Sequence, residues 1–378
     1  MKKIKWKRTS CLVLAGILAA SLYGCGNSGK DQSAPESTTA SGAMSDAAAN
    51  SSSGEALSEP AAETTAVQAA APVYETVELN VAYHPGLAAL CVPGIGEKHG
   101  FFEEEGLKIN WIQFTAGPPE IAAMVAGDLQ FGYIGHGAHT LCAQGEAQVV
   151  SLSHVSNSEW LIVRENSGIK SMEDLKGKKI VTQLGTSGEV ILNLALERAG
   201  MTRSDVNVYN MDMAGAVSAF IAGQADAICS WDAHNHAIRT NVEEELYTLA
   251  QTSDFMDKMA FPGSWVATSG YLADNHDIAV RFVRALNKCY EYRAGNMDET
   301  IQLSAEFGGL EYEAVDANRD SAIYYSATEL KQMLADGEIT DIYQSQLNNF
   351  IETGKVEDGD VAEYVRTDIM AEALEYLN

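Results

Sequence analysis

The chain has 378 residues, of which 46% are hydrophobic and 20% are charged, and Asp and Glu outnumber Lys and Arg by 52 to 25. The resulting net charge of −27 repels nucleic acids and anionic lipid headgroups, so we expect no nucleic-acid partner. A small anion in a local pocket is not excluded, because a pocket sets its own electrostatic field.

The first 24 residues have the layout of a secretory signal peptide. Basic residues precede an apolar run at 11–22 that is shorter than a membrane span. The run ends in Leu22-Tyr23-Gly24-Cys25, which resembles a bacterial lipoprotein box, in which cleavage occurs before a Cys that becomes lipidated. We expect a lipid on Cys25 and an extracytoplasmic protein anchored to the bacterial cell membrane. The alternative is an ordinary signal peptide followed by a chance Cys.

The segment after Cys25 has the composition of a linker. Residues 26–72 contain no Trp, Phe, Tyr, Ile or Cys and consist mostly of Ala, Ser, Thr, Gly, Glu and Pro. Such a composition cannot bury enough apolar surface to fold. We therefore predict a disordered Ala/Ser/Thr-rich tether over 25–75 and a globular body over 76–378, which is long enough for two lobes.

Strand-like apolar runs alternate with helical patterns in the first half of the body. The predicted strands lie at 77–83, 107–114, 129–134 and 148–154, and the predicted helices lie at 87–104 and 119–126. This α/β alternation predicts a mostly parallel sheet with helices on both faces. Ligands bind beyond the carboxyl ends of strands in such sheets, so the candidate loops are 84–88, 115–118, 135–139 and 155–160.

A second block repeats this organisation. Residues 118–139 align with 216–234, because both contain a helix, Ala-Gly, a short apolar strand, a small-residue loop and a His. The chain then returns at 264–272 and continues with mostly helical patterns. We predict two similar lobes that face each other across a cleft. Lobe 1 would comprise 76–165 plus 262–378, and lobe 2 would comprise 166–261, with hinge strands near 160–166 and 255–269.

Five stretches of the body resemble the solute-binding lipoproteins of ABC importers for nitrate, sulfonates, taurine and thiamine-pyrimidine precursors. They are GEKHGFFEEEGL (96–107), GPPE (117–120), AGDLQFG (126–132), MEDLKGKKI (172–180) and AGQADA (222–227). The family's usual Trp-(Asp/Glu)-Pro is Trp231-Asp232-Ala233 here. The resemblance implies a two-lobed fold of the type II periplasmic-binding-protein kind, with the ligand cleft between the lobes.

The resemblance also implies a function without catalysis or cofactor. The leading hypothesis is a monomeric, lipid-anchored receptor that closes its lobes over a small sulfonate- or taurine-like solute and delivers it to a membrane permease. An uncharged or cationic heteroaromatic ligand is the alternative. A thiamine-pyrimidine-synthase-like enzyme is less favoured, because the chain lacks a Cys cluster, a Gly-x-Ser-x-Gly elbow and a His-Glu-x-x-His motif. A sensor lipoprotein of the same fold stays open.

The turn at 185–188 is a candidate anion site. It follows an apolar strand and begins a helix, so its backbone N–H groups, Thr186 and Ser187 would face an acidic or polar ligand end. The competing interpretation is a capping box, with Thr186 as N-cap and Glu189 as the third helical residue. A capping box needs no ligand.

Other candidate ligand residues lie at or beside predicted strand ends. Asp232 is a candidate partner for an ammonium or ring nitrogen, or else it caps the helix after it. His136 and His139 would share a helical face, so with His84 or His234 they are also weighed as metal ligands, although packing is favoured. Aromatic faces with few polar groups are typical of a small-molecule pocket. Besides the turn and Asp232, the set comprises Tyr83, His84, Gly117, His136, His139, Trp160, Trp231 and His234.

Four cysteines fall within the body, without CxxC or zinc-ligand spacing: Cys91, Cys142, Cys229 and Cys289. We expect them to be buried small apolar residues. The sequence leaves open whether any two of them form a disulfide.

Overall fold

The computed structural model describes residues 74–377. The expected signal peptide, the lipidation site Cys25 and the tether up to residue 73 lie outside the described residues. The described residues all belong to one compact unit. None of the helices described in it combines the length and the apolar character that crossing a membrane requires.

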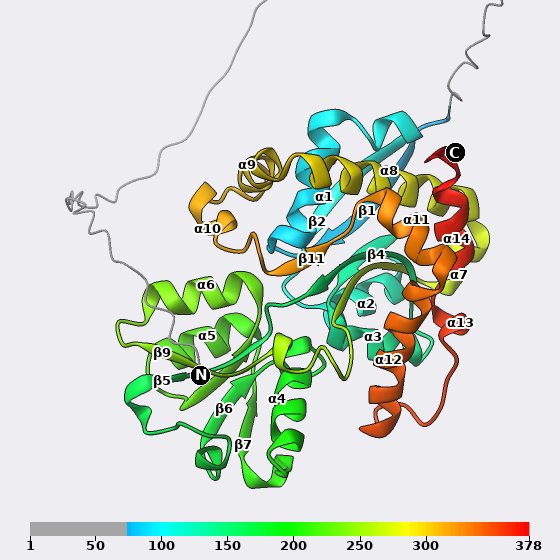
Figure 1. Cartoon of the computed structure of the whole chain (residues 1–378). Coiled ribbons are helices and arrows are strands. Elements are labelled where there is room, and N and C mark those ends of the chain that lie inside the picture. Colours follow the sequence, from blue (N-terminus) through cyan, green and yellow to red (C-terminus); the bar gives the residue numbers. More distant parts are fainter. Residues whose placement is uncertain (1–73, 378) are drawn as a thin grey trace, which may run out of the picture. The chain divides into compact units, whose positions relative to one another are not determined.

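Strands from both ends of the body build the first sheet (Figure 1). Its order is β11-β4-β10-β3-β1-β2. β1 pairs in parallel with β2 and β3, whereas β10 runs antiparallel between β3 and β4. The bounds are β1 Val77–Tyr83, β2 Leu107–Gln113, β3 Phe131–Ile134, β4 Gln148–Ser156, β10 Pro262–Ala267 and β11 Ala322–Tyr324.

The second sheet has the order β7-β6-β8-β5-β9. β6 pairs in parallel with β7 and β8, and β5 runs antiparallel to β8 and β9. The bounds are β5 Trp160–Arg164, β6 Lys179–Thr182, β7 Asn207–Asn210, β8 Ala227–Ser230 and β9 Leu246–Gln251. Most strands of each sheet therefore run in the same direction, as predicted, and the antiparallel strands β5, β10 and β11 make both sheets mixed. The chain crosses from the first sheet into the second at β5 and returns to the first sheet at β10. Each of these two strands is antiparallel to both of its neighbours.

Helices cover both sheets, as α/β layering requires. In the second sheet, α4 packs on one face, and α5 and α6 pack on the other (Figure 1). The C-terminal helices α8 and α14 contact β4 of the first sheet. The bounds are α1 Leu87–His99, α2 Gly117–Ala126, α3 His139–Ala143, α4 Ser187–Arg198, α5 Met213–Ile221, α6 Asp232–Asn241, α7 Ser269–Asp274, α8 His276–Gly295, α9 Met297–Gly308, α10 Tyr312–Asp316, α11 Ala327–Asp336, α12 Glu338–Glu352, α13 Val361–Tyr364 and α14 Thr367–Ala373.

The first helix is shorter than predicted. Helix α1 ends at His99, since Gly100 adopts a left-handed conformation with φ of 70° that closes the last turn. The predicted end at 104 belongs to a separate 3₁₀ turn at Glu103–Glu105. Pro93 lies inside the helix without ending it.

The hydrophobic core is divided between the sheets. One cluster of buried residues surrounds the first sheet and includes Phe131, Trp265 and Phe282. Two other clusters cover the two faces of the second sheet, one including Ile191 of α4 and the other Phe220 of α5. The lobes built on the two sheets therefore have their own cores.

Two segments connect the sheets. Residues 157–159 lead from β4 to β5, and residues 252–261 lead from β9 back to β10. The crossings therefore begin a few residues before the predicted hinge strands. β5 pairs only within the second sheet, although the sequence analysis assigned 160–165 to lobe 1. The division of the chain into lobes stays a proposal, and sheet membership favours a boundary before Trp160.

The described cysteines are free and buried: Cys91, Cys142, Cys229 and Cys289. Burial raises the pKa of the Cys142, Cys229 and Cys289 thiols. They therefore pack as small apolar residues, as expected.

Candidate functional site

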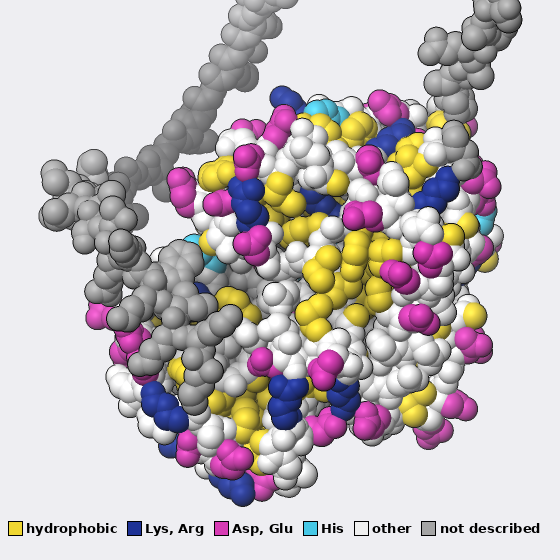
Figure 2. Space-filling model, in the orientation of Figure 1, with side chains coloured by type: hydrophobic (Ala, Val, Ile, Leu, Met, Phe, Trp, Pro, Cys, Tyr) yellow, Lys and Arg dark blue, Asp and Glu magenta, His cyan; other side chains and the backbone are white. Residues whose placement is uncertain are grey.

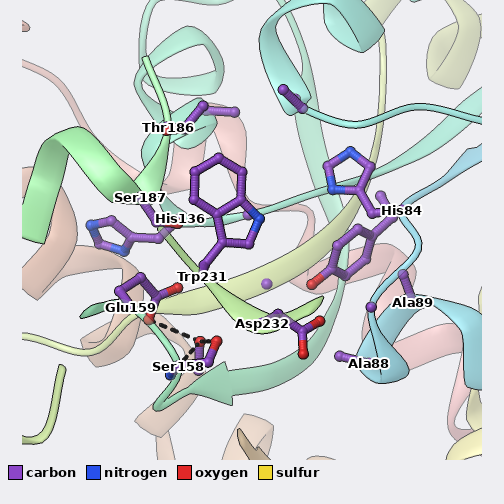
Figure 3. A pocket seen from close by; sticks show the side chains of 18 of the residues that line it. His84, Ala88, Ala89, His136, Ser158, Glu159, Thr186, Ser187, Trp231 and Asp232 are labelled. Atoms are coloured by element: carbon purple, nitrogen blue, oxygen red, sulfur yellow. Dashed lines mark hydrogen bonds between the residues drawn. The ribbon is translucent and has the colours of Figure 1, made fainter. Parts of the chain in front are cut away.

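A cavity of about 60 Å³ lies where loops of the first sheet meet loops of the second (Figure 3). The first lobe supplies residues after β1, at the start of α2 and in the 3₁₀ helix η2 (His136–Ala138). The second lobe supplies the start of α4 and the start of α6. Eight of the predicted site residues line this cavity: His84, Gly117, His136, Thr186, Ser187, Trp231, Asp232 and His234.

Three predicted residues lie elsewhere. Tyr83 is buried against Trp111 and Phe307, because successive strand residues point to opposite faces and His84 takes the cavity side. Trp160 stacks against the Arg239 guanidinium, 4.4 Å from the ring centre. The sequence pattern alone did not distinguish these faces.

His139 is the third, and it lies in the core. Its Nε2 is 2.7 Å from Ser264 Oγ and its Nδ1 is 3.1 Å from the His136 carbonyl oxygen. Both ring nitrogens are therefore engaged, which excludes the joint metal site with His136. Across residues 74–377, no group of three His, Cys, Asp or Glu side chains is arranged to hold a metal ion.

His84 lines the cavity, and its ring contacts a buried carboxyl group. Its Nε2 is 2.8 Å from Oε2 of Glu120, which is fully buried on α2. Burial raises the pKa of Glu120 to about 7, and the neighbouring His84 opposes that rise. The His84 ring is therefore held at the cavity wall by a buried carboxyl group of the same lobe.

The turn before α4 does not form the capping box considered from the sequence. Thr186 is the N-cap, but its Oγ1 donates to the Gln183 carbonyl at 2.6 Å. Glu189 Oε2 accepts from the Gly185 N–H at 2.9 Å, and its Oε1 is 3.0 Å from Lys355 Nζ. Gly185 has a φ of 78°, which places its N–H within reach of Glu189. Thr186 and Ser187 therefore line the cavity, while Glu189 is held by the turn and by Lys355.

Asp232 is held in an unusual backbone conformation. Among the described residues it alone combines a side chain with a positive φ, of 42°. Its Oδ1 is enclosed and finds no hydrogen-bond partner within the described chain. Trp231 is the N-cap of α6, so Asp232 does not cap that helix. Burial, reinforced by Glu159, raises the pKa of Asp232 to about 7, and His84 and Ser321 oppose the rise.

Glu159 also lines the cavity, and the sequence analysis did not select it. It lies in the first crossing, with only 4% of its surface exposed. Its Oε2 accepts from Thr252 Oγ1 at 2.7 Å and from Ser156 Oγ at 2.9 Å. Burial raises the pKa of Glu159, and the Thr252 hydrogen bond opposes that shift. The loop 155–160 was predicted to contribute to the site, but through Trp160 and not through Glu159.

The remaining ring nitrogens of the cavity favour their neutral forms. Burial lowers the pKa of His154 to about 3 and that of His234 to about 4, and it lowers the pKa of His136 well below its ordinary value. His154 was also missed by the sequence analysis, because it lies within β4 and not in a loop. Within residues 74–377, the cavity lining includes no Lys or Arg.

The sequence model of the NMT1/THI5-like family matches residues 95–300. The chain belongs to this family. A candidate binding protein of Brucella abortus is 32% identical over 282 residues, which are 75% of this chain and 88% of that protein. A candidate aliphatic-sulfonate-binding protein of Bacillus subtilis is 25% identical over 221 residues, which are 57% of this chain and 64% of that one.

Solved structures share the fold of this chain. The alkanesulfonate-binding protein of Xanthomonas axonopodis pv. citri bound to MOPS has a TM-score of 0.58 and 23% identity to this chain. The match covers 78% of this chain and 99% of that protein. The family resemblance inferred from the sequence and the two-lobed periplasmic-binding-protein fold are thereby confirmed.

Proposed function

We propose that the protein is the extracytoplasmic solute-binding component of an ABC importer. It captures a small organic solute between its lobes and delivers that solute to a membrane permease. The observation that carries the proposal is a cavity lined by both lobes, each with its own core. Binding proteins among the similar sequences and structures support the same function.

Closure of the lobes couples to binding, because a ligand in this cavity contacts both sides at once. The lobes approach closely at two glycines. A Cβ on Gly137 would lie 2.2 Å from the backbone carbon of Thr186, and a Cβ on Gly86 would lie 1.6 Å from Asp232 Oδ2. These contacts are those of a closed state, which a bound solute would hold together.

The solute class expected from the sequence, a sulfonate or taurine-like molecule, stays part of this proposal. Thr186 and Ser187 bring the start of α4 to the cavity, where the first N–H groups of a helix are free to bind an anionic end. Asp232 faces the same cavity and would bind an ammonium group. A zwitterion such as taurine would place its sulfonate at the start of α4 and its ammonium group at Asp232.

A heteroaromatic ligand is supported by a different observation. Figure 3 shows the ring of Trp231 in the middle of the group of labelled side chains. Its ring centre is 5.3 Å from that of His234, in an edge-to-face arrangement. A flat, nitrogen-bearing ligand would use this aromatic surface and the carboxylates around it.

The cavity lacks one group that some enzymes use. None of the four described cysteines lines it, so a thiolate nucleophile is not at hand there. The proposed binding function itself involves only closure and release.

The proposal is tested by thermal unfolding of the full chain, purified in detergent, with sulfonates, nitrate, amino acids, pyrimidines, flavins and fractions of growth-medium extract. A solute at about 100 times its Kd adds about 2.7 kcal/mol to the free energy of unfolding, which raises the midpoint by several degrees. A chain whose midpoint responds to no solute and to no fraction is not a solute receptor.

A further inference from the structure

We propose that the cavity selects solutes with a positively charged nitrogen, which binds between the carboxylates of Asp232 and Glu159. This inference rests on the proposed function and names the ligand class of the same site. It covers a zwitterion with an ammonium group as well as a cationic heteroaromatic. It excludes a ligand that is only an anion.

The position of Asp232 is not explained by the fold. Its backbone is in the left-handed region, which a non-glycine residue occupies only at a cost in free energy. Its Oδ1 is inaccessible to solvent and accepts no hydrogen bond from the described part of the chain. Position 86 of the opposite lobe is a glycine, and any larger residue there would overlap with Oδ2. Both lobes therefore accommodate this carboxylate at the cavity, where a ligand would supply the donor that Oδ1 lacks.

Glu159 supplies a second negative group from a different element. Hydroxyl donors from Ser156 and Thr252 bind one of its oxygens, so its side chain is fixed before any ligand arrives. Its charge disfavours the ionised form of Asp232. Two buried carboxylates that repel each other are both stabilised by one cation placed between them.

No side chain of the described lining compensates these charges. His136, His154 and His234 favour their neutral forms because they are buried. His84 faces Asp232, but its Nε2 is paired with the buried Glu120. A sulfonate or nitrate without a cationic group would therefore meet acidic side chains and no basic one in the described lining.

The aromatic lining fits a cation as well. The Trp231 ring belongs to the same lining, next in sequence to Asp232, and a tryptophan face attracts a desolvated cation. Primary ammonium, amidinium-like and protonated ring nitrogens all provide N–H donors for the free Asp232 Oδ1. These are the chemical groups that the cavity would recognise.

The first experiment compares ligands that differ only in the charged nitrogen. Taurine is paired with isethionate, and pyridylmethylamine with pyridylmethanol, and binding to the full chain is measured by calorimetry. We expect an amine to bind at least about tenfold more tightly than its alcohol, and Asp232→Asn and Glu159→Gln to remove that preference. Asp128→Asn, a change at an exposed position, is the control and should leave it intact. Isethionate or nitrate binding as tightly as the amines would overturn the inference.

A second measurement does not depend on the chosen probes. Growth-medium extract is separated on a cation exchanger at acidic pH, and each fraction is tested for its effect on the unfolding midpoint. The stabilising solute should be retained with the cations. If it appears only among unretained or anionic solutes, the cation inference fails while the receptor function stands. If no fraction stabilises the chain, the receptor function itself fails.

The ligand-free protein gives a third readout. Asn tolerates a positive φ better than most residues, and Asp232→Asn removes a half-buried carboxylate whose Oδ1 has no donor in the described chain. We expect the midpoint of the ligand-free chain to rise in Asp232→Asn and to stay unchanged in Asp128→Asn. A lower midpoint for Asp232→Asn would show that this carboxylate supports the fold, which contradicts a role reserved for a ligand.

Discussion

Asp232 and Glu120 are carboxyl groups for which the empty fold favours the neutral form. Burial is the main cause in both, and it raises each pKa to about 7. Glu120 has a partner in His84, whereas Asp232 Oδ1 has none in residues 74–377. Near neutral pH, the charge of Asp232 is therefore set by whatever occupies the cavity.

Cation affinity should depend on pH through Asp232. The groups that act on it are Glu159, which raises its pKa, and His84 and Ser321, which lower it. A bound cation requires the ionised carboxylate, so affinity should fall as the pH drops from about 8 to about 5.5 and Asp232 becomes protonated. Calorimetry of taurine or pyridylmethylamine at these two pH values measures the change. The pH dependence should be weaker in Asp232→Asn, and an unchanged profile would contradict the assignment.

Stability of the empty protein should change with pH in the opposite direction. A carboxyl group with a raised pKa in the folded state stabilises the fold below its unfolded pKa, and this stabilisation is lost as the pH rises through about 7. The increase in the free energy of unfolding that Asp232→Asn gives over the parent chain should therefore be larger at about pH 8 than at about pH 5. Urea unfolding at both pH values tests this, with Asp128→Asn as the surface control. An equal difference at both values would contradict the buried charge.

Sequence reasoning located the loops of the site better than the side chains in them. Asp232 was selected because no Lys or Arg lies near it in sequence, which agrees with the described lining. Tyr83 and His84 are neighbours, and only the pleat of β1 decides which one faces the cavity. Glu159 gave no signal of its own, because its partner Thr252 is 93 residues away.

At the scale of elements, the start of α4 meets the helix η2 of the opposite lobe without room for a side chain. A Cβ at position 137 would overlap with the backbone of Thr186, which cannot move aside as a flexible side chain would. Gly137→Ala should therefore disfavour closure and weaken the binding of any stabilising solute by about tenfold or more. Affinity is measured by calorimetry, and closure by small-angle scattering with and without the solute.

A glycine away from the cavity provides the control. Gly270 is exposed on α7, and a Cβ there would meet no atom within 4 Å. Gly270→Ala should bind and close like the parent chain. Equal affinity of the two alanine variants would mean that this contact does not belong to the ligand-bound state.

The two crossing segments are joined through Glu159. Thr252 Oγ1 accepts from the Glu159 N–H at 3.0 Å, and it donates to the Glu159 carboxylate. Thr252→Val preserves the shape but leaves these buried groups short of a partner, which should cost about 1–3 kcal/mol of unfolding free energy and weaken cation binding. Thr353→Val, at an exposed residue whose hydroxyl donates to the Asn349 carbonyl at the end of α12, should leave cation binding unchanged. Stability loss without any loss of affinity would limit Thr252 to a structural role.

Element types were predictable from local pattern, whereas the order of the strands in the sheets was not. Val77–Tyr83 was located to the residue because its alternation is local. β10 was placed in the right region, but its position between β3 and β4 depends on a chain that has passed through the second lobe and returned. The capping box failed for a similar reason, since Lys355, far along the chain, binds Glu189.

At the scale of the molecule, the acidic surface and the cavity serve different purposes. Figure 2 shows Asp and Glu side chains spread over the visible face, with Lys and Arg among them. Exposed charges are screened by salt over about 8–10 Å, so they influence diffusion and partner contact more than the enclosed site. Solute selection should therefore vary little with ionic strength compared with attachment to a permease.

Delivery to a membrane permease also requires the receptor to stay near the membrane. The lipid expected on Cys25 would keep it there. If Cys25 carries the proposed lipid, the full chain should sediment with membranes and incorporate labelled fatty acid. Cys25→Ser should abolish labelling and release the protein, because the acidic body is repelled by anionic lipid. Cys91→Ser, which changes a buried cysteine of the body, should stay membrane-bound and labelled. A Cys25→Ser chain that remains with the membrane would show that another segment holds it there, and capture near the permease would then need a different anchor.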